Sequence, residues 1–330
     1  GICSVEDNIS TLEPFSVQST SANSLSLSLP DSSSRARMAA PSSLGLLQVQ
    51  SFTAKCRPVT VSRRAVFAVC ASTASAATKE AILRPFRENR ALKIISGLQN
   101  FDRSNVASVV TAADKGGATH VDIACDQDLV KLALKLTNLP ICVSSVDPSA
   151  FQSAVEAGAQ MIEIGNYDSF YEEGIEFSSE QILNLTRETR KMFPDITLSV
   201  TVPHTLSLPD QTRLAELLEE EGADIIQTEG GKCSSPTKPG VLGLIEKATP
   251  TLAAAYSISR AVSIPVMCAS GLSSVTAPMA VTAGAAGVGV GSAINKLNDV
   301  VAMIAEVRSI AEALGTASRT VSEDLRTVHH

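Results

Sequence analysis

A short phrase of Gly, Ala and then apolar residues recurs four times along the chain, and it constrains the fold more than any other feature. The copies begin at Gly117, Gly158, Gly222 and Gly284, and each follows a stretch with helical amphipathic spacing. A Gly in the left-handed conformation can end a helix without steric cost, and the apolar residues after it have the pattern of a buried strand. The repeated order of helix, Gly and strand is typical of a parallel β/α protein.

Four further apolar segments fit between or before these copies, at residues 92–98, 139–144, 193–200 and 264–269. An amphipathic stretch follows each of the eight segments. Eight strands and eight helices in alternation predict a (β/α)8 TIM barrel over residues 91–315. An open doubly wound sheet is the alternative, and the absence of a Gly-x-Gly-x-x-Gly turn after the first strand disfavours it. Capping residues open most of the predicted helices, among them Asp102, Asp126, Ser178, Asp210 and Asn298.

The first 90 residues have another composition. No acidic residue lies between Asp31 and Glu80, whereas Arg and Lys are scattered among Ser, Ala and Thr. This composition is typical of an organelle transit peptide, and a disordered nuclear or cytosolic tail is the alternative. We therefore expect the mature protein inside an organelle. The predicted parts are a disordered upstream extension at 1–37, a disordered transit peptide at 38–75, a linker or N-terminal helix at 76–90, the barrel at 91–315 and a C-terminal tail at 316–330.

Charge and cysteine content narrow the class of ligand. The whole chain carries −7, and because residues 1–79 contribute +3, the remainder carries −10. An acidic body without a basic cluster disfavours nucleic-acid binding. No apolar run is long enough to span a bilayer, so we expect no membrane association. No Cys-x-x-Cys pair is present, and His204 at the end of the fifth predicted strand is a lone histidine, so we expect no metal site.

Two consecutive Gly/Ser loops follow the last two predicted strands. Barrel enzymes often bind a phosphate at this place, on backbone N–H groups and at a helix N-terminus. The glycines would let the backbone approach an anion, although they would also serve simple helix packing. The residues predicted to bind phosphate are Ser270, Gly271, Gly289, Gly291 and Ser292.

Alignment of the four repeats indicates which side chains point into the barrel. Asp122, Glu163 and Gln227 occupy the same place in successive copies, so they share one interior layer. Lys93 on the first strand is the cation that would neutralise the two carboxylates. Catalysis and a structural polar core are equally good accounts of Asp122 and Glu163. Glu229 lies one layer nearer the mouth and is a candidate general acid or base.

Lys232 belongs to a long loop after the sixth strand, which begins with two glycines that can act as a hinge. Its amine could contact an anionic substrate or form a Schiff base. A solvated loop Lys is the simpler alternative.

Several stretches resemble the plastid and cyanobacterial family known as hypothetical chloroplast frame twenty-three. They are Lys93–Leu98 followed by Asn100–Asp102, Thr119–Ala124, Gln227–Gly231, Ala269–Leu272 and Gly289–Ser292. The resemblance covers nearly the whole predicted barrel. It implies an aldolase-type barrel in a plastid, so together with the transit peptide we expect the mature protein in the chloroplast stroma. The resemblance implies no particular reaction, so the candidate residues rest on barrel geometry alone.

Three functions from different classes remain open. The first is a lyase or isomerase that acts on a small phosphorylated metabolite without a cofactor. The second is an FMN-dependent oxidoreductase, because the same two loops would hold the phosphate of the flavin. The third is a non-catalytic barrel that binds a phosphorylated effector and regulates a partner. The shortage of aromatic residues, with no Trp and three Tyr, favours the first over a flavin site. The sequence leaves a homo-oligomer open.

Overall fold

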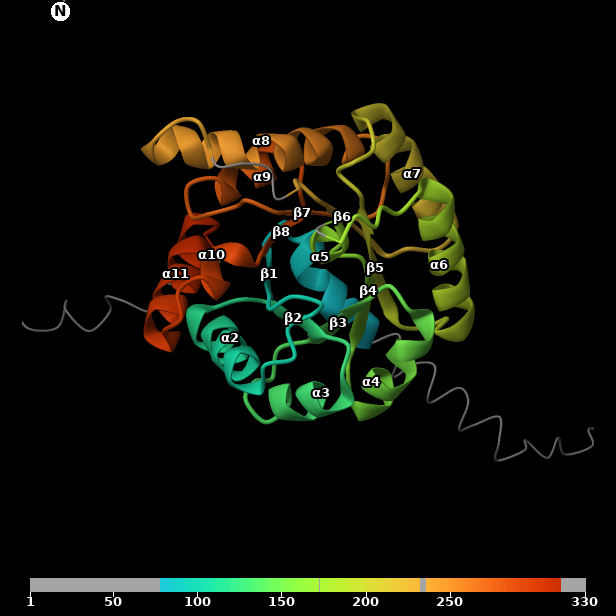
Figure 1. Ribbon diagram of the computed structural model, residues 1–330, viewed down its shortest axis with the longest axis horizontal. Coiled ribbons are helices and arrows are strands. Elements are labelled where there is room, and N and C mark those ends of the chain that lie inside the picture. Colours follow the sequence, from blue (N-terminus) through green and yellow to red (C-terminus); the bar gives the residue numbers. More distant parts are fainter. Residues whose placement is uncertain (1–77, 172, 232–235, 316–330) are drawn as a thin grey trace, which may run out of the picture. The chain divides into compact units, whose positions relative to one another are not determined.

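The computed structural model describes residues 78–171, 173–231 and 236–315. Eight parallel strands pair in chain order and close into a barrel, with β8 beside β1 (Figure 1). The predicted barrel is therefore confirmed, and the doubly wound alternative is wrong. The strands are β1 (Ala91–Ile95), β2 (His120–Ala124), β3 (Ile141–Ser145), β4 (Met161–Ile164), β5 (Thr197–Val202), β6 (Ile225–Thr228), β7 (Val266–Ala269) and β8 (Gly287–Val290).

Helices surround the barrel on its outside (Figure 1). Because parallel neighbours need a crossover, each strand returns through at least one helix. The helices are α2 (Arg103–Gly116), α3 (Gln127–Ala133), η1 (Pro148–Ala150), α4 (Phe151–Ala157), α5 (Asp168–Tyr171), α6 (Ser179–Met192), α7 (Leu208–Glu220), α8 (Gly240–Ile258), α9 (Ala277–Ala283), α10 (Ser292–Asn295) and α11 (Val300–Ala313). The last of them, α11, packs against α2 and closes the ring of helices.

The repeated glycines have the backbone conformation that the sequence predicts. Gly117, Gly158, Gly222 and Gly284 have φ angles of 91°, 116°, 90° and 110°. A residue with a Cβ is strained in this left-handed region, so each copy of the phrase ends its helix at the Gly. The apolar residues that follow then enter the barrel as β2, β4, β6 and β8.

Three of the predicted helix caps are confirmed, and two are wrong. Asp102, Asp126 and Ser178 accept hydrogen bonds from the first turns of their helices. For α7 the cap is Ser207 rather than Asp210, because the helix begins earlier, with Pro209 in its first turn. For α11 the cap is Asp299 rather than Asn298.

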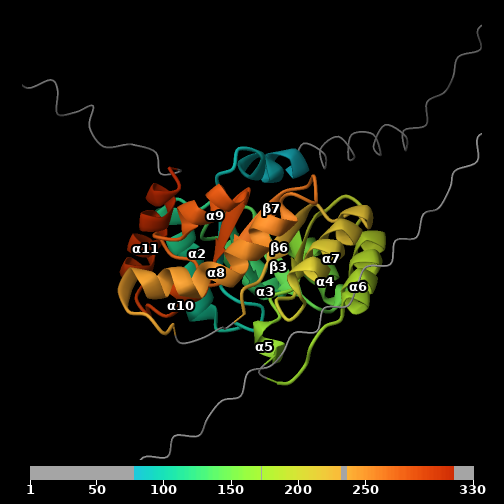
Figure 2. The ribbon, with the colours of Figure 1, turned by 90° about the horizontal axis from the view of Figure 1, so that it is seen from above.

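A helical segment at residues 78–87 lies across one end of the barrel, opposite the end that carries α5 (Figure 2). Its Ile82 and Phe86 are buried and join an apolar cluster with inward-facing strand residues, including Met161 and Met267. The buried His120 ring packs on Phe86, with ring centroids 5.1 Å apart, and its Nε2 lies 3.1 Å from the Ile82 carbonyl oxygen. This end of the barrel is therefore closed by packing, and a ligand has access at the α5 end.

Among the described residues, no helix has the length and apolar character required to cross a bilayer. The segments predicted as upstream extension, transit peptide and C-terminal tail lie outside the described residues, as does Lys232.

Candidate functional site

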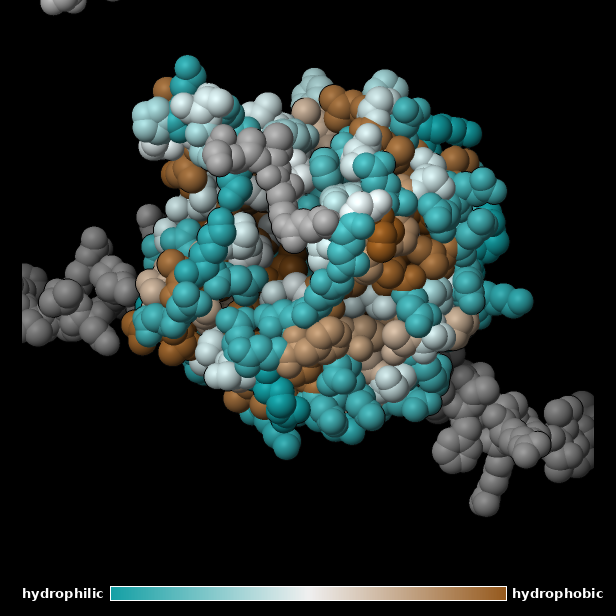
Figure 3. Space-filling model, in the orientation of Figure 1, coloured by the Kyte–Doolittle hydropathy of each residue, from teal (hydrophilic) through white to brown (hydrophobic). Residues whose placement is uncertain are grey.

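The loops after β7 and β8 line a cavity of about 620 Å³ at the open end of the barrel. Figure 3 shows this face of the molecule, which is hollowed near the barrel axis. The volume is within the range of small-molecule sites, roughly 300 to 1,000 Å³. All five residues predicted to bind phosphate line the cavity: Ser270, Gly271, Gly289, Gly291 and Ser292.

The β7 loop has an unusual backbone at the cavity wall. Ser270 and Gly271 have consecutive positive φ angles of 80° and 70°. A left-handed Ser is strained, and such strain gathers at ligand-binding loops. At Gly271, a Cβ would come within 2.8 Å of the Lys247 carbonyl oxygen, so only Gly fits without a shift of backbone. The helix after Gly291, α10, is a single turn, so its dipole adds little to an anion site.

Two lysines that the sequence analysis did not single out line the same cavity. Lys247 comes from α8, and Lys296 follows α10. Burial and the neighbouring Lys296 charge lower the pKa of the Lys247 ammonium. No carboxylate within the described ranges forms an ion pair with either lysine. Two adjacent cations beside Gly/Ser loops attract an anion, and the repulsion between the two lysines falls when the anion binds between them.

Below the cavity, Lys93 and Glu163 form an ion pair inside the barrel, and both side chains are completely buried. Burial alone would lower the pKa of the Lys93 ammonium, but the adjacent Glu163 carboxylate raises it above its ordinary value. Burial raises the pKa of the third ionisable group in this layer, Asp122, to about 7. A buried charge is stable only when it is paired, so the interior holds one ion pair beside a carboxyl group that resists ionisation.

Asn166 and Gln227 connect this interior to the cavity that they line. Asn166 donates to Glu163 Oε1 at 2.9 Å and to Asp122 Oδ2 at 3.2 Å. Gln227 donates to the same Glu163 oxygen at 2.7 Å. The Oε1 of Gln227 is buried and accepts no hydrogen bond within the described part of the chain. The structure thus brings together Asp122, Glu163 and Gln227, which the repeat alignment assigned to one interior layer, and Lys93, the cation expected to neutralise the two carboxylates.

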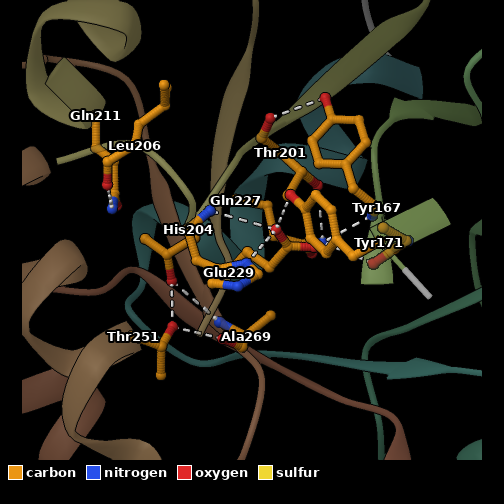
Figure 4. Close-up of polar contacts among 12 residues, drawn as sticks. Tyr167, Tyr171, Thr201, His204, Leu206, Gln211, Gln227, Glu229, Thr251 and Ala269 are labelled. Carbon is orange, nitrogen blue, oxygen red and sulfur yellow. Dashed lines mark hydrogen bonds and ion pairs between the residues drawn. The ribbon is translucent and has the colours of Figure 1, made fainter. Parts of the chain in front are cut away.

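Glu229 lies above this layer with its carboxylate almost buried, at 4% exposure (Figure 4). The Tyr167 backbone N–H donates to Oε1 at 3.1 Å, and the Tyr171 hydroxyl donates to Oε2 at 2.8 Å. His204 contributes its backbone N–H at 3.3 Å and Nδ1 at 3.0 Å, both to Oε2. Four neighbouring groups therefore fix the position and orientation of this carboxylate.

The hydrogen bond to Glu229 raises the pKa of His204, although burial opposes the shift. The His204 side chain keeps 27% of its surface exposed, whereas that of Glu229 keeps 4%. A histidine that a carboxylate orients is a common acid–base arrangement. The sequence analysis gave His204 little weight because it could not show the contact with Glu229.

Asp168, His204 and Glu229 offer ligand atoms that lie within 4.8 Å of one another. Two carboxylates and an imidazole suit several divalent metals. Both oxygens of Glu229 already accept hydrogen bonds, so a metal would have to displace them. The sequence analysis expected no metal site and did not anticipate that Asp168, from α5, lies close to His204.

The family description "Protein of unknown function (DUF561)" matches residues 77–320. The chain is 43% identical over 219 residues to the uncharacterized protein ycf23 of Cyanophora paradoxa, covering 66% of this chain and 90% of that protein. It is 36% identical over 244 residues to the protein of the same name in Pyropia yezoensis, covering 74% of this chain and 89% of that protein.

Solved structures resemble the chain at low identity. (S)-3-O-geranylgeranylglyceryl phosphate synthase from Thermoplasma acidophilum is 14% identical, with a TM-score of 0.49 over 72% of this chain and 98% of that one. Thiamine phosphate pyrophosphorylase from Pyrococcus furiosus is 18% identical, with a TM-score of 0.46 over 69% and 97%. At these scores the likeness has no bearing on activity. The matched length and the identities of the relatives show that the chain belongs to the Ycf23 family (DUF561), as its sequence motifs indicated.

Proposed function

We propose that the protein binds a small phosphorylated metabolite at the mouth of its barrel and acts on it as a lyase or isomerase. The observation that carries the proposal is the pair of lysines, Lys247 and Lys296, beside the Gly/Ser loops of β7 and β8. Cations that have no carboxylate partner among the described residues, next to a backbone that admits close approach, suit a phosphate group.

Acid–base chemistry is the reaction class that the rest of the cavity supports. Glu229 lines the cavity and is hydrogen-bonded to His204, so a proton taken from a ligand carbon or hydroxyl can be accepted by one member of this pair. Tyr171 donates to the same carboxylate, and burial together with the Glu229 charge raises the pKa of that phenol. The phenol therefore remains a hydrogen-bond donor at neutral pH. Lys93 and Glu163 lie beneath and hold the layer that positions Gln227.

Binding is tested by calorimetry of the full-length protein with inorganic phosphate. A charge-assisted hydrogen bond contributes about 1.5 kcal/mol or more, so replacement of both lysines, in K247A/K296A, should weaken phosphate binding by about 100-fold. Gly291→Asp should abolish binding by placing a carboxylate against the anion. The matched control is K131A/K191A, which removes the same net charge at exposed positions on α3 and α6. Equal affinity in the lysine variant and the control contradicts the anion site.

Catalysis is tested once native mass spectrometry has identified a copurifying phosphorylated compound. Glu229→Gln retains the shape and removes the titrating carboxyl, so turnover should fall by about 100-fold while ligand affinity is kept. Unchanged turnover would contradict the assigned role of Glu229. A yellow preparation that a nicotinamide donor reduces would instead support the FMN-dependent oxidoreductase. A ligand that binds without being converted would support the regulatory barrel.

A further inference from the structure

A second cavity, of about 640 Å³, adjoins the mouth of the barrel. It lies between α5, the segment after β5, α7 and α8, and Figure 4 shows several of its side chains around Glu229. Asp168 and Glu229 line both cavities, so the two spaces border the same pair of carboxylates. The lining residues are Asp168, Tyr171, His204, Leu206, Leu208, Gln211, Glu229, Gly230, Pro250 and Ala253.

The two cavities differ in chemistry. Apolar groups make the wall of the second cavity away from Glu229, with Leu206, Leu208, Pro250 and Ala253 contributing. Leu208 is 40% exposed, although it is a large aliphatic side chain at the start of α7. No Lys or Arg is among the described residues of this lining, whereas Lys247 and Lys296 line the other cavity. A phosphate therefore has counter-ions only on one side of Glu229, and an apolar group gains by leaving water on the other.

We propose that the ligand is amphipathic, a phosphate monoester whose aliphatic or aromatic group occupies the second cavity. This inference rests on the proposed function, since it assumes that the phosphate lies against the β7 and β8 loops. The shared carboxylates favour one ligand molecule over two. A single ligand that fills both cavities has its middle part beside Asp168 and Glu229, with its phosphate in one cavity and its apolar group in the other. The reacting carbon then lies beside the hydrogen-bonded pair of Glu229 and His204.

Gln211 adds a polar point to the apolar wall. Its Nε2 donates to the Leu206 carbonyl oxygen at 2.8 Å, which fixes the side chain at the cavity (Figure 4). Its Oε1 is buried and accepts no hydrogen bond within the described ranges. A buried acceptor without a donor costs free energy, so a hydroxyl or amine on the ligand's apolar group is the feature that this wall would select.

The experiment compares methyl phosphate, n-hexyl phosphate and n-hexanol as ligands of the full-length protein by calorimetry. Every two methylenes transferred from water to an apolar wall strengthen binding by about tenfold. Hexyl phosphate has five more methylenes than methyl phosphate, so it should bind about 300-fold more tightly. Equal affinity of the two esters overturns the inference and leaves the phosphate site intact. Loss of binding of both esters and of inorganic phosphate refutes the proposed function itself. If hexanol binds as tightly as hexyl phosphate and does not compete with methyl phosphate, the proposal that one ligand molecule occupies both cavities is wrong.

Variants on α8 and α7 locate the effect. Ala253→Phe fills the second cavity and should remove the advantage of hexyl phosphate, while the affinity for methyl phosphate stays within about twofold. Thr249→Phe is the matched control, because this exposed position of the same helix lines neither cavity. Leu208→Asn is the second variant if Ala253→Phe lowers the folded yield, and it should weaken hexyl phosphate alone. An undiminished hexyl advantage in the folded variants contradicts the placement of the apolar group.

Discussion

Replacement of Lys93 by Met tests whether the interior polar layer depends on one buried cation. In the wild-type barrel this ammonium pairs with Glu163, and both side chains are completely buried. Met has a similar length and fills the space without a charge, so the variant leaves two carboxyl groups, Glu163 and Asp122, without their cation. Removal of one partner of a buried ion pair costs about 3 to 5 kcal/mol. We expect that loss in the free energy of unfolding at pH 8.

The pH dependence gives the sign of the effect. Burial raises the folded-state pKa of the Asp122 carboxyl, and the Lys93 charge opposes that shift. Without Lys93, the pKa of Asp122 therefore rises further above its unfolded value of about 3.9. A raised carboxyl pKa leaves stability intact at acid pH and removes it as pH increases, by about 1.4 kcal/mol per unit for each proton retained. The stability difference between wild type and Lys93→Met should therefore be small near pH 5 and grow towards pH 8.

Urea unfolding followed by far-UV circular dichroism provides the measurement, because the chain has no Trp for fluorescence. The matched variants are Glu163→Gln and the double variant K93M/E163Q, which removes both charges. The double-mutant cycle should give a coupling energy of about 3 kcal/mol. Additive effects within about 0.5 kcal/mol, or a Lys93→Met loss that does not depend on pH, would refute the buried pair as the support of this layer.

Two further predictions concern the closed end of the barrel and the N-terminal segment. Burial lowers the pKa of His120 to about 4, so the barrel should lose about 3 kcal/mol of stability as pH falls from about 6.5 to 4. Unfolding measured across this pH range should show that His120→Gln lacks the loss. The same pH dependence of stability in both proteins would contradict the role of His120. Residues 38–72 should carry a fluorescent reporter into plastids, with the mature protein beginning near Ala71. Diffuse cytosolic fluorescence would count against the transit peptide.

The fold could be predicted from the sequence because the signals that define its strands and helices are local. A left-handed Gly after a helix, at Gly117 or Gly284, leaves a mark in the residue type itself. Alternation along each following strand then assigns Asp122, Glu163 and Gln227 to one side, and the structure places them in contact through Asn166. The interior layer was therefore predictable from the position of each residue within the repeat, without knowledge of β3, β5 and β7, which lie between the repeated strands.

The cationic part of the mouth was not predictable in the same way. Amphipathic spacing in the sequence places the helix before the seventh strand at about residues 250–262, which leaves Lys247 outside any element. The structure begins α8 at Gly240 and continues it through Pro250, so the earlier turns carry Lys247 to the cavity. Tertiary packing has overridden a local signal here. Lys296 lies just beyond the single turn α10, and nothing in its neighbouring residues distinguishes it from a solvated lysine.

The buried ion pair also determines which hydrogen-bonding group the barrel presents to a ligand. Glu163 is a carboxylate that accepts hydrogen bonds, so Gln227 must turn its amide nitrogen towards it, and that nitrogen also reaches Thr201. The amide oxygen of Gln227 is consequently the atom left without a donor in the described part of the chain. Because a buried acceptor without a donor costs free energy, the floor of the mouth cavity favours a ligand with a hydroxyl or amine at that point. The charge on Glu163 thus influences which ligand binds, although Glu163 makes no contact with the ligand. Lys93 acts in the same way, through its ion pair with Glu163.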